Sequence, residues 1–174
     1  MKITINAGHS EVDPGAIGSR GTFEATVCRQ ISQLFEQELL KRGHQVQFLQ
    51  LDDLEVVCQQ ANAYEPELFI SLHANAHGNR QAQGTECYYY EESNDGELLA
   101  VCLQQALVAT LQLRNRGVKT ANFYVLTFTQ APAVLVELAF ISNPYEENLL
   151  CTKQQSFVQA LLTGLEDYLK IKQL

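Results

Sequence analysis

The chain lacks the long apolar segments that insertion into a membrane requires. No uninterrupted apolar run among its 174 residues reaches the ~18 residues of a transmembrane helix. Met1 and Lys2 lead directly into Ile3-Thr4-Ile5, without the apolar stretch of a secretory signal peptide. We therefore expect no membrane insertion and no signal peptide in this chain, and the sequence leaves its route of export open.

Positive charge is also scarce. The chain has 12 Lys and Arg residues against 20 Asp and Glu residues, which gives a formal net charge of −8 at pH 7. A nucleic-acid-binding protein needs a basic face, and an anionic membrane attracts basic segments. We expect neither of these partners for this chain.

The five cysteines do not form the patterns of paired or metal-bound thiols. Their number is odd, and no two of them are spaced as CxxC. This argues against a disulfide framework and against a thiolate zinc site. Apolar neighbours predict buried free thiols for most of them. They are Cys28, Cys58, Cys87, Cys102 and Cys151.

The composition and the hydrophobic pattern predict one folded α/β domain. Hydrophobic residues make up 46% of the chain and charged residues 18%, which is typical of a globular domain. Strands are expected at residues 2–6, 46–49, 68–72, 84–90, 123–128 and 133–137. Helices are expected at residues 24–41, 54–64, 94–111 and 152–169. Strands that alternate with helices favour a mainly parallel sheet covered by helices.

Three metal-ligating residues fall near one rim of such a sheet. His9 follows the first strand, His73 follows the strand at residues 68–72, and Glu24 opens the first helix. Two imidazoles and a carboxylate are a zinc ligand set with one open position, where water becomes acidic enough to react at neutral pH. Each residue alone also fits an ordinary role: an exposed loop histidine, a hydrogen-bonded strand-end histidine, and an acid at a helix N-terminus. The metal site thus depends on the convergence of all three.

Two further acids lie in predicted strands. Glu137 interrupts the apolar segment 133–141, where a lone carboxylate must be paired, protonated or functional. It is interpreted either as part of a structural salt bridge or as a general base, and then acid, beside the metal. Around Glu86, polar and apolar residues alternate as they do in a half-buried strand. We therefore favour a position on the solvated face of the sheet for Glu86 over a contact with substrate.

Four segments together resemble a known enzyme family. They are Gly8-His9 with residues 13–18, residues 21–24, residues 68–76 and residues 132–144; residues 116–119 add a weaker match. In this order and spacing, from Ile3 to about Leu169, the chain resembles the catalytic domain of zinc-dependent N-acetylmuramoyl-L-alanine amidases of the amidase-3 type. Family members are cell-wall hydrolases such as autolysins, sporulation enzymes and phage lysins.

The resemblance implies a fold, a reaction and roles for individual residues. The fold would be a single catalytic domain over residues 1–174, with a twisted, mainly parallel sheet flanked by helices on both faces. Zn²⁺ would be held by His9, Glu24 and His73, and Glu137 would be the catalytic acid/base. The reaction would be hydrolysis of the amide between N-acetylmuramic acid and L-alanine in peptidoglycan, at the bacterial cell wall outside the cytoplasmic membrane.

Substrate contacts and alternative functions are less constrained by the sequence. The candidates for substrate contact are Asn75 and Asn143, with Glu86 as the less favoured third. The first loop departs from the family pattern, with Asn6-Ala7 before Gly8-His9 and Ser10-Glu11 after them, which affects substrate preference and not the ligand set. A zinc peptidase acting on stem peptides or cross-links, and a non-catalytic wall-binding module, are the alternatives. No wall-anchoring segment is evident, so we expect attachment through groove contacts, through a wall-targeting or regulatory partner, or through a segment outside this chain.

Overall fold

The computed structural model describes residues 1–173. Within them, six strands form one sheet in the order β2-β1-β3-β6-β4-β5. The strands are β1 (Lys2–Ala7), β2 (Gln45–Leu49), β3 (Leu68–Asn75), β4 (Thr85–Tyr89), β5 (Asn115–Thr120) and β6 (Ala133–Phe140). The first four in spatial order are parallel, whereas β4 is antiparallel to β6 and parallel to β5. The predicted mainly parallel sheet is confirmed.

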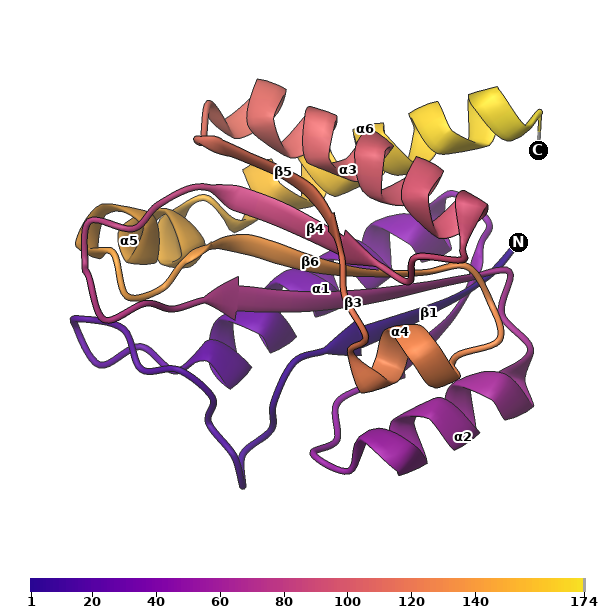
Figure 1. Ribbon diagram of the computed structural model, residues 1–174, viewed down its shortest axis with the longest axis horizontal. Helices are drawn as coiled ribbons and strands as arrows, with labels where there is room; N and C mark the ends of the chain where they lie inside the picture. The colour runs from indigo at the N-terminus through magenta and orange to yellow at the C-terminus, as the bar shows by residue number, and fades with distance from the viewer. Residues whose placement is uncertain (174) are drawn as a thin grey trace.

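Helices cover both faces of this sheet, also as expected (Figure 1). They are α1 (Glu24–Lys41), α2 (Leu54–Tyr64), α3 (Asn94–Leu111), α4 (Tyr124–Phe128), α5 (Pro144–Thr152) and α6 (Gln154–Lys172). The larger hydrophobic core lies between the sheet and α1, α3 and α6, and a smaller one lies under α2 and α4. Because both faces are covered, the central strands β1, β3 and β6 are mostly buried.

The helix α1 shows how the sequence positions the site. Its residues Val27, Ile31, Phe35 and Leu39 recur at helical spacing and are fully or almost fully buried against the sheet. Packing of this stripe fixes the helix, so its first residue is held next to the sheet. The long irregular connection from β1 to α1 then crosses the carboxyl end of β1 before the helix begins. This is where the predicted metal ligands lie.

The prediction of a strand at residues 123–128 was wrong. The segment Phe-Tyr-Val-Leu-Thr-Phe is rich in residues that favour strands, but Tyr124–Phe128 forms the short helix α4. Val125 and Leu126 are buried in the smaller core, and the backbone N–H of Thr127 bonds to the carbonyl of Phe123. Packing against the sheet and α2 has overridden the local preference.

Two elements were not predicted at all. The strand β5 is an edge strand with charged residues and Gly117 at φ 86°, which hides the alternation that marks a strand. The helix α5 begins at Pro144, and the side chain of Asn143 caps it. The last helix therefore starts at Gln154, two residues after the expected Thr152.

Candidate metal centre

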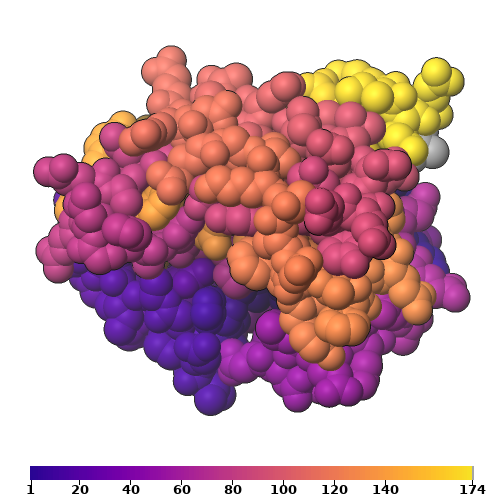
Figure 2. All heavy atoms as spheres, in the orientation of Figure 1, coloured from indigo at the N-terminus to yellow at the C-terminus, as the bar shows by residue number. Residues whose placement is uncertain are grey.

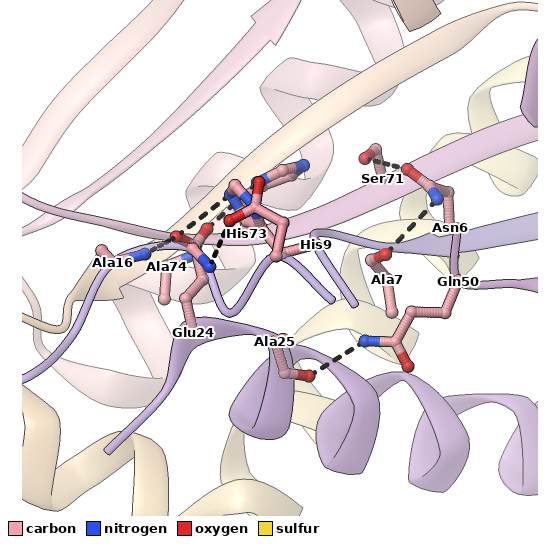
Figure 3. A network of polar contacts seen from close by, with 12 residues as sticks. Asn6, Ala7, His9, Ala16, Glu24, Ala25, Gln50, Ser71, His73 and Ala74 are labelled. Carbon is pink, nitrogen blue, oxygen red and sulfur yellow. Dashed lines mark hydrogen bonds and ion pairs between the residues drawn. The ribbon is translucent and has the colours of Figure 1, made fainter. Parts of the chain in front are cut away.

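His9, Glu24 and His73 meet at the carboxyl ends of β1 and β3. One ligand atom from each lies within 4.8 Å of the others (Figure 3). The Glu24 carboxylate stands between the two rings, with Oε1 3.1 Å from Nδ1 of His73 and Oε2 3.3 Å from Nε2 of His9. Three residues that are 15 and 49 positions apart along the chain thus form one cluster.

Each candidate ligand comes from a different part of the backbone. His9 follows β1 in the left-handed region, with φ 59°, a conformation that costs free energy in a residue other than glycine. Hydrogen bonds from the N–H of Gly8 to the carbonyl of Leu72 and from the N–H of Ser10 to the carbonyl of Asp13 hold the chain on either side of it. His73 lies inside β3 and not after it, since this strand extends to Asn75.

Two glycines leave the space that the rings occupy. A Cβ on Gly8 would lie 2.4–2.7 Å from the imidazole of His73, and a Cβ on Gly15 would lie 2.5 Å from His9 and 2.7 Å from Glu24. Gly15 also has φ 68°, which a side chain rarely adopts. The main chain therefore contacts the cluster closely at both glycines, where any larger residue would displace a ring or the carboxylate.

We expect Gly8→Ala to lower metal affinity by about 10- to 100-fold, because the added methyl group displaces the His73 ring. Loss of a residue that orients a metal ligand has an effect of this size. Metal titration with a competing chelator measures this. Gly78→Ala is the matched control, since a Cβ there meets nothing within 4 Å. Equal affinity in the two variants would contradict the close approach at Gly8.

The Glu24 carboxylate is buried and kept ionised. Burial alone would raise its pKa, but hydrogen bonds from His73 and from the N–H groups of Ala16 and Ala74 bring the pKa below its usual value (Figure 3). Asp13 Oδ2 lies 3.1 Å from Nδ1 of His9, on the side of the ring away from Glu24. Such an outer carboxylate fixes the ring and its tautomer, as is usual behind a metal-bound histidine.

Glu137 lies beside His73 in the sheet. The two residues are register partners on β6 and β3, so their side chains leave the same face. Its Oε2 is buried and has no hydrogen-bond partner, and no ion pair with this residue occurs within residues 1–173. Burial, together with the nearby charges of Glu24 and Glu86, raises the pKa of Glu137 to about 8. The interpretation of Glu137 as part of a structural salt bridge is therefore wrong.

Glu86 is buried, not solvated as the sequence suggested. It is 2% exposed and stands opposite Glu137 in the antiparallel pair β4–β6. Its carboxylate accepts hydrogen bonds from Nδ2 of Asn75 at 2.6 Å, from Nε of Arg116 at 3.0 Å, and from Nζ of Lys119. These contacts lower its pKa against the effect of burial. Nothing in the sequence pattern around Glu86 revealed these partners.

A hollow gives access to this face of the sheet. Figure 2 shows it between the N-terminal loop in indigo, α2 in purple and α4 in orange. A cavity of about 290 Å³ is lined mainly by apolar side chains, including Leu54 and Phe123, with His73 and Glu137 among the polar groups. A neighbouring pocket of about 190 Å³ contains His9 and His73. The cluster and Glu137 therefore face a space that can receive part of a substrate.

Comparison with known proteins assigns this arrangement to a family. A family model described as N-acetylmuramoyl-L-alanine amidase matches residues 3–167. The chain belongs to this amidase family. Its members hydrolyse peptidoglycan and depend on a metal, and the fold, the His-Glu-His cluster and the expected reaction class agree with that membership.

Individual relatives cover nearly the whole chain. It is 36% identical to the uncharacterized protein YqiI of Bacillus subtilis (strain 168), over 95% of this chain and 84% of that protein. It is 35% identical to the N-acetylmuramoyl-L-alanine amidase LytC of the same strain, over 95% of this chain but 35% of LytC. The solved amidase AmiC2 of Nostoc punctiforme superposes with a TM-score of 0.91 at 27% identity, covering 98% of this chain and 97% of that one.

The amidase contains two further buried acids on α5 that the sequence analysis missed, Glu146 and Glu147, and the second of them contacts the loop before α1. Glu147, on α5, is 1% exposed and accepts hydrogen bonds from the hydroxyl of Ser19 and from the N–H groups of Arg20 and Thr22. A Cβ on Gly18 would lie 2.3 Å from its carboxylate. Glu147 thus ties the loop that precedes the ligand helix to α5. Its one sequence signal is its place in the first turn of a helix that was not predicted.

We expect Glu147→Gln to lower the free energy of unfolding by about 1–3 kcal/mol, because several donors lose an ionised acceptor. Chemical denaturation measures this, with the exposed acid Glu91 changed to Gln as control. Hydrogen bonds lower the pKa of Glu147 despite its burial, so its contribution is present above the pKa of the unfolded chain and disappears as the pH falls through the folded value. A difference between wild type and variant that does not shrink in acid would contradict this role.

The other predicted substrate contacts have structural partners. Asn143 caps α5 by accepting from the N–H groups of Tyr145 and Glu146, and it donates to the carbonyl of Ala82. Asn75 donates to Glu86. Contact of these side chains with substrate stays a prediction. Among the described helices, none has the length and apolarity to cross a membrane.

Proposed function

We propose that this amidase is a zinc enzyme that cleaves the bond between the lactyl group of N-acetylmuramic acid and the L-alanine of the stem peptide. The observation that carries the proposal is the convergence of His9, Glu24 and His73 beside Glu137, whose buried Oε2 has no hydrogen-bond partner among the described residues. Family membership supports the reaction class. The identity of the metal and the role of each residue are inferred from the chemistry of the donor set.

The three donors fit zinc. Two imidazole nitrogens and one carboxylate oxygen are a catalytic zinc ligand set that leaves a position open for substrate or water. The buried Glu24 carboxylate is kept ionised, as a ligand must be, and Asp13 orients the His9 ring. When bound, zinc polarises the scissile carbonyl, lowers the pKa of a neighbouring water molecule and favours the ionised form of Glu137.

Glu137 is the proposed acid/base. Its buried Oε2 has no protein partner, so it is free to accept a proton from the attacking water. The same carboxyl group then donates that proton to the nitrogen of L-alanine as the amide bond breaks. The surrounding apolar side chains, which include Leu135 and Phe123, limit the access of bulk water to the Glu137 carboxyl group during proton transfer. Asn75, Glu86 and Asn143 are proposed to position the substrate around these groups.

The proposal has a direct test in the digestion of purified peptidoglycan. Mass analysis is expected to find stem peptides whose first residue is L-alanine with a free amino group. Cleavage within the stem peptide or a cross-link would favour the zinc peptidase, and no cleavage would favour the wall-binding module. Activity is expected to fall on dialysis against a chelator and to return with Zn²⁺, with metal content followed by elemental analysis.

The proposed site of action is the bacterial cell wall. A chain with a net charge of −8 is repelled by anionic wall polymers, so general electrostatic attraction cannot hold it there. Attachment would come from contacts in the groove around the metal centre, or from a wall-targeting or regulatory partner.

A further inference from the structure

A row of polar side chains crosses four neighbouring strands on the face that carries the metal centre. His73 on β3 is in register with Glu137 on β6, and Glu137 is directly opposite Glu86 on β4. Partners in register leave the same face of a sheet. Arg116 and Lys119, on the edge strand β5, reach back to the Glu86 carboxylate and complete the row.

The end of this row carries an excess of positive charge. Arg116 and Lys119 share the single carboxylate of Glu86, so the group of three has a net charge of +1 in a chain whose net charge is −8. Asn75, which donates to the other oxygen of Glu86, adds no charge. Within residues 1–173, no other carboxylate lies within ion-pair distance of either cation.

Both cations also keep donors available to a ligand. Their side chains are 30% and 40% exposed, whereas that of Glu86 is 3% exposed. Arg116 contacts Glu86 through Nε, and its guanidinium lies over the ring of Phe140 at 4.8 Å, so its two terminal nitrogens have no acceptor in the described part of the chain. A planar guanidinium with two free nitrogens matches the geometry of a carboxylate.

Lys119 is connected to the cavity next to Glu137 through two aromatic side chains. Its Nζ lies 5.6 Å from the centre of the Tyr88 ring, and that ring packs edge-on against Phe123 at 5.1 Å. Phe123 lines the cavity that contains Glu137. Since neighbouring strands are roughly 5 Å apart, the backbone of β5 lies about 10 Å from that of β6, and its long side chains reach back across β4.

We propose that Arg116 and Lys119 form a subsite for a carboxylate of the stem peptide, on the side of the scissile amide that leaves with L-alanine. The chemistry of the substrate selects this side. The carboxyl group of the muramic acid is consumed in the scissile amide, so a free carboxylate near that bond belongs to the peptide. One or two residues of extended chain span about 3–7 Å. The carboxylate of Glu86, which both cations contact, belongs to the residue directly opposite Glu137 in the pair of neighbouring strands β4 and β6.

This inference rests on the proposed function, and its test separates the two. The test compares two muramyl peptides that differ only in the residue after L-alanine. In one, this residue is D-glutamate with a free α-carboxylate; in the other, it is D-isoglutamine, whose α-carboxyl group is an amide. We expect kcat/KM to be at least about tenfold higher for the carboxylate form, as for a hydrogen bond between charged groups. The ratio of the two values is independent of the fraction of folded enzyme.

Variants locate the preference on these side chains. In Lys119→Met the ratio is expected to fall to about threefold or less, while Arg116 and Asn75 still satisfy the buried Glu86. Lys119→Arg is expected to restore most of the preference. Lys170→Met is the matched control, because it removes one exposed positive charge from the last helix. Equal kcat/KM for the two peptides in the wild type, or an unchanged ratio in Lys119→Met and Arg116→Gln, would overturn the subsite.

A binding measurement separates failure of the subsite from failure of the proposed function. Should the wild type hydrolyse neither peptide, the amidase mechanism is wrong, whatever the subsite binds. Calorimetric titration with the dipeptides L-Ala-D-Glu and L-Ala-D-isoglutamine, each with its γ-carboxyl group blocked as an amide, then tests the subsite alone. Tighter binding of the carboxylate form, lost in Lys119→Met, supports it; equal binding of both dipeptides by the wild type rejects it.

Discussion

Glu137→Gln is expected to lower kcat by about 10²- to 10⁴-fold and to leave the metal bound. The carboxyl group of Glu137 stands beside His73 but is not one of the three converging ligands, so its loss removes proton transfer and spares the metal centre. Gln has nearly the same shape but neither accepts nor releases a proton at neutral pH. Kinetics on muramyl peptides, with zinc content measured on the same sample, checks both parts. Near-normal turnover in this variant would remove Glu137 from the mechanism.

The same substitution has an expected effect on stability that is independent of activity. In the metal-free protein, burial and the charges of Glu24 and Glu86 raise the pKa of Glu137 from 4.5 to about 8. The unfolded chain loses this proton near pH 4.5 and the folded protein only near pH 8, so the free energy of unfolding falls as the pH rises between these values. Glu137→Gln removes that dependence. Its stability relative to the wild type should therefore increase from pH 5 to pH 8 in denaturation experiments, and a constant difference would contradict the raised pKa.

The cluster of His9, Glu24 and His73 was within reach of the sequence because simple topological rules place its parts. Parallel strands end at one edge of the sheet, so a residue that follows β1 and one near the end of β3 are neighbours even though His9 and His73 are 64 positions apart. Glu137 was noticeable because a carboxylate in an apolar strand needs an explanation. Periodicity also predicted α1, whose first residue, Glu24, is the third proposed ligand.

The surroundings of the site depend on pairings that no local pattern encodes. The edge strand β5 has polar residues and a glycine, and it became part of the sheet by pairing with β4. Both cations that pair with Glu86 lie on β5. Because the sequence did not predict this strand, the position of Glu86 in β4 suggested a solvated face. The helix α4 shows the opposite case, since a strand-like composition became helical where Val125 and Leu126 could be buried. The proposed specificity determinants lie in these parts of the fold, whereas the proposed catalytic groups lie in its central strands.

Removal of a single ligand should have the largest effect on the metal itself. We expect His73→Ala to lower the affinity for Zn²⁺ by at least about 10²-fold, beyond the 10- to 100-fold cost of losing an outer-shell contact, and to abolish measurable hydrolysis. Two ligands would remain, and the Glu24 carboxylate would lose its partner at 3.1 Å while staying buried. His77→Ala is the matched control, because that histidine lies four residues further along and outside the converging cluster. Elemental analysis after dialysis distinguishes the two variants. Stoichiometric zinc retained by His73→Ala would disprove the ligand set, because two of its three members cannot hold the ion as tightly as all three.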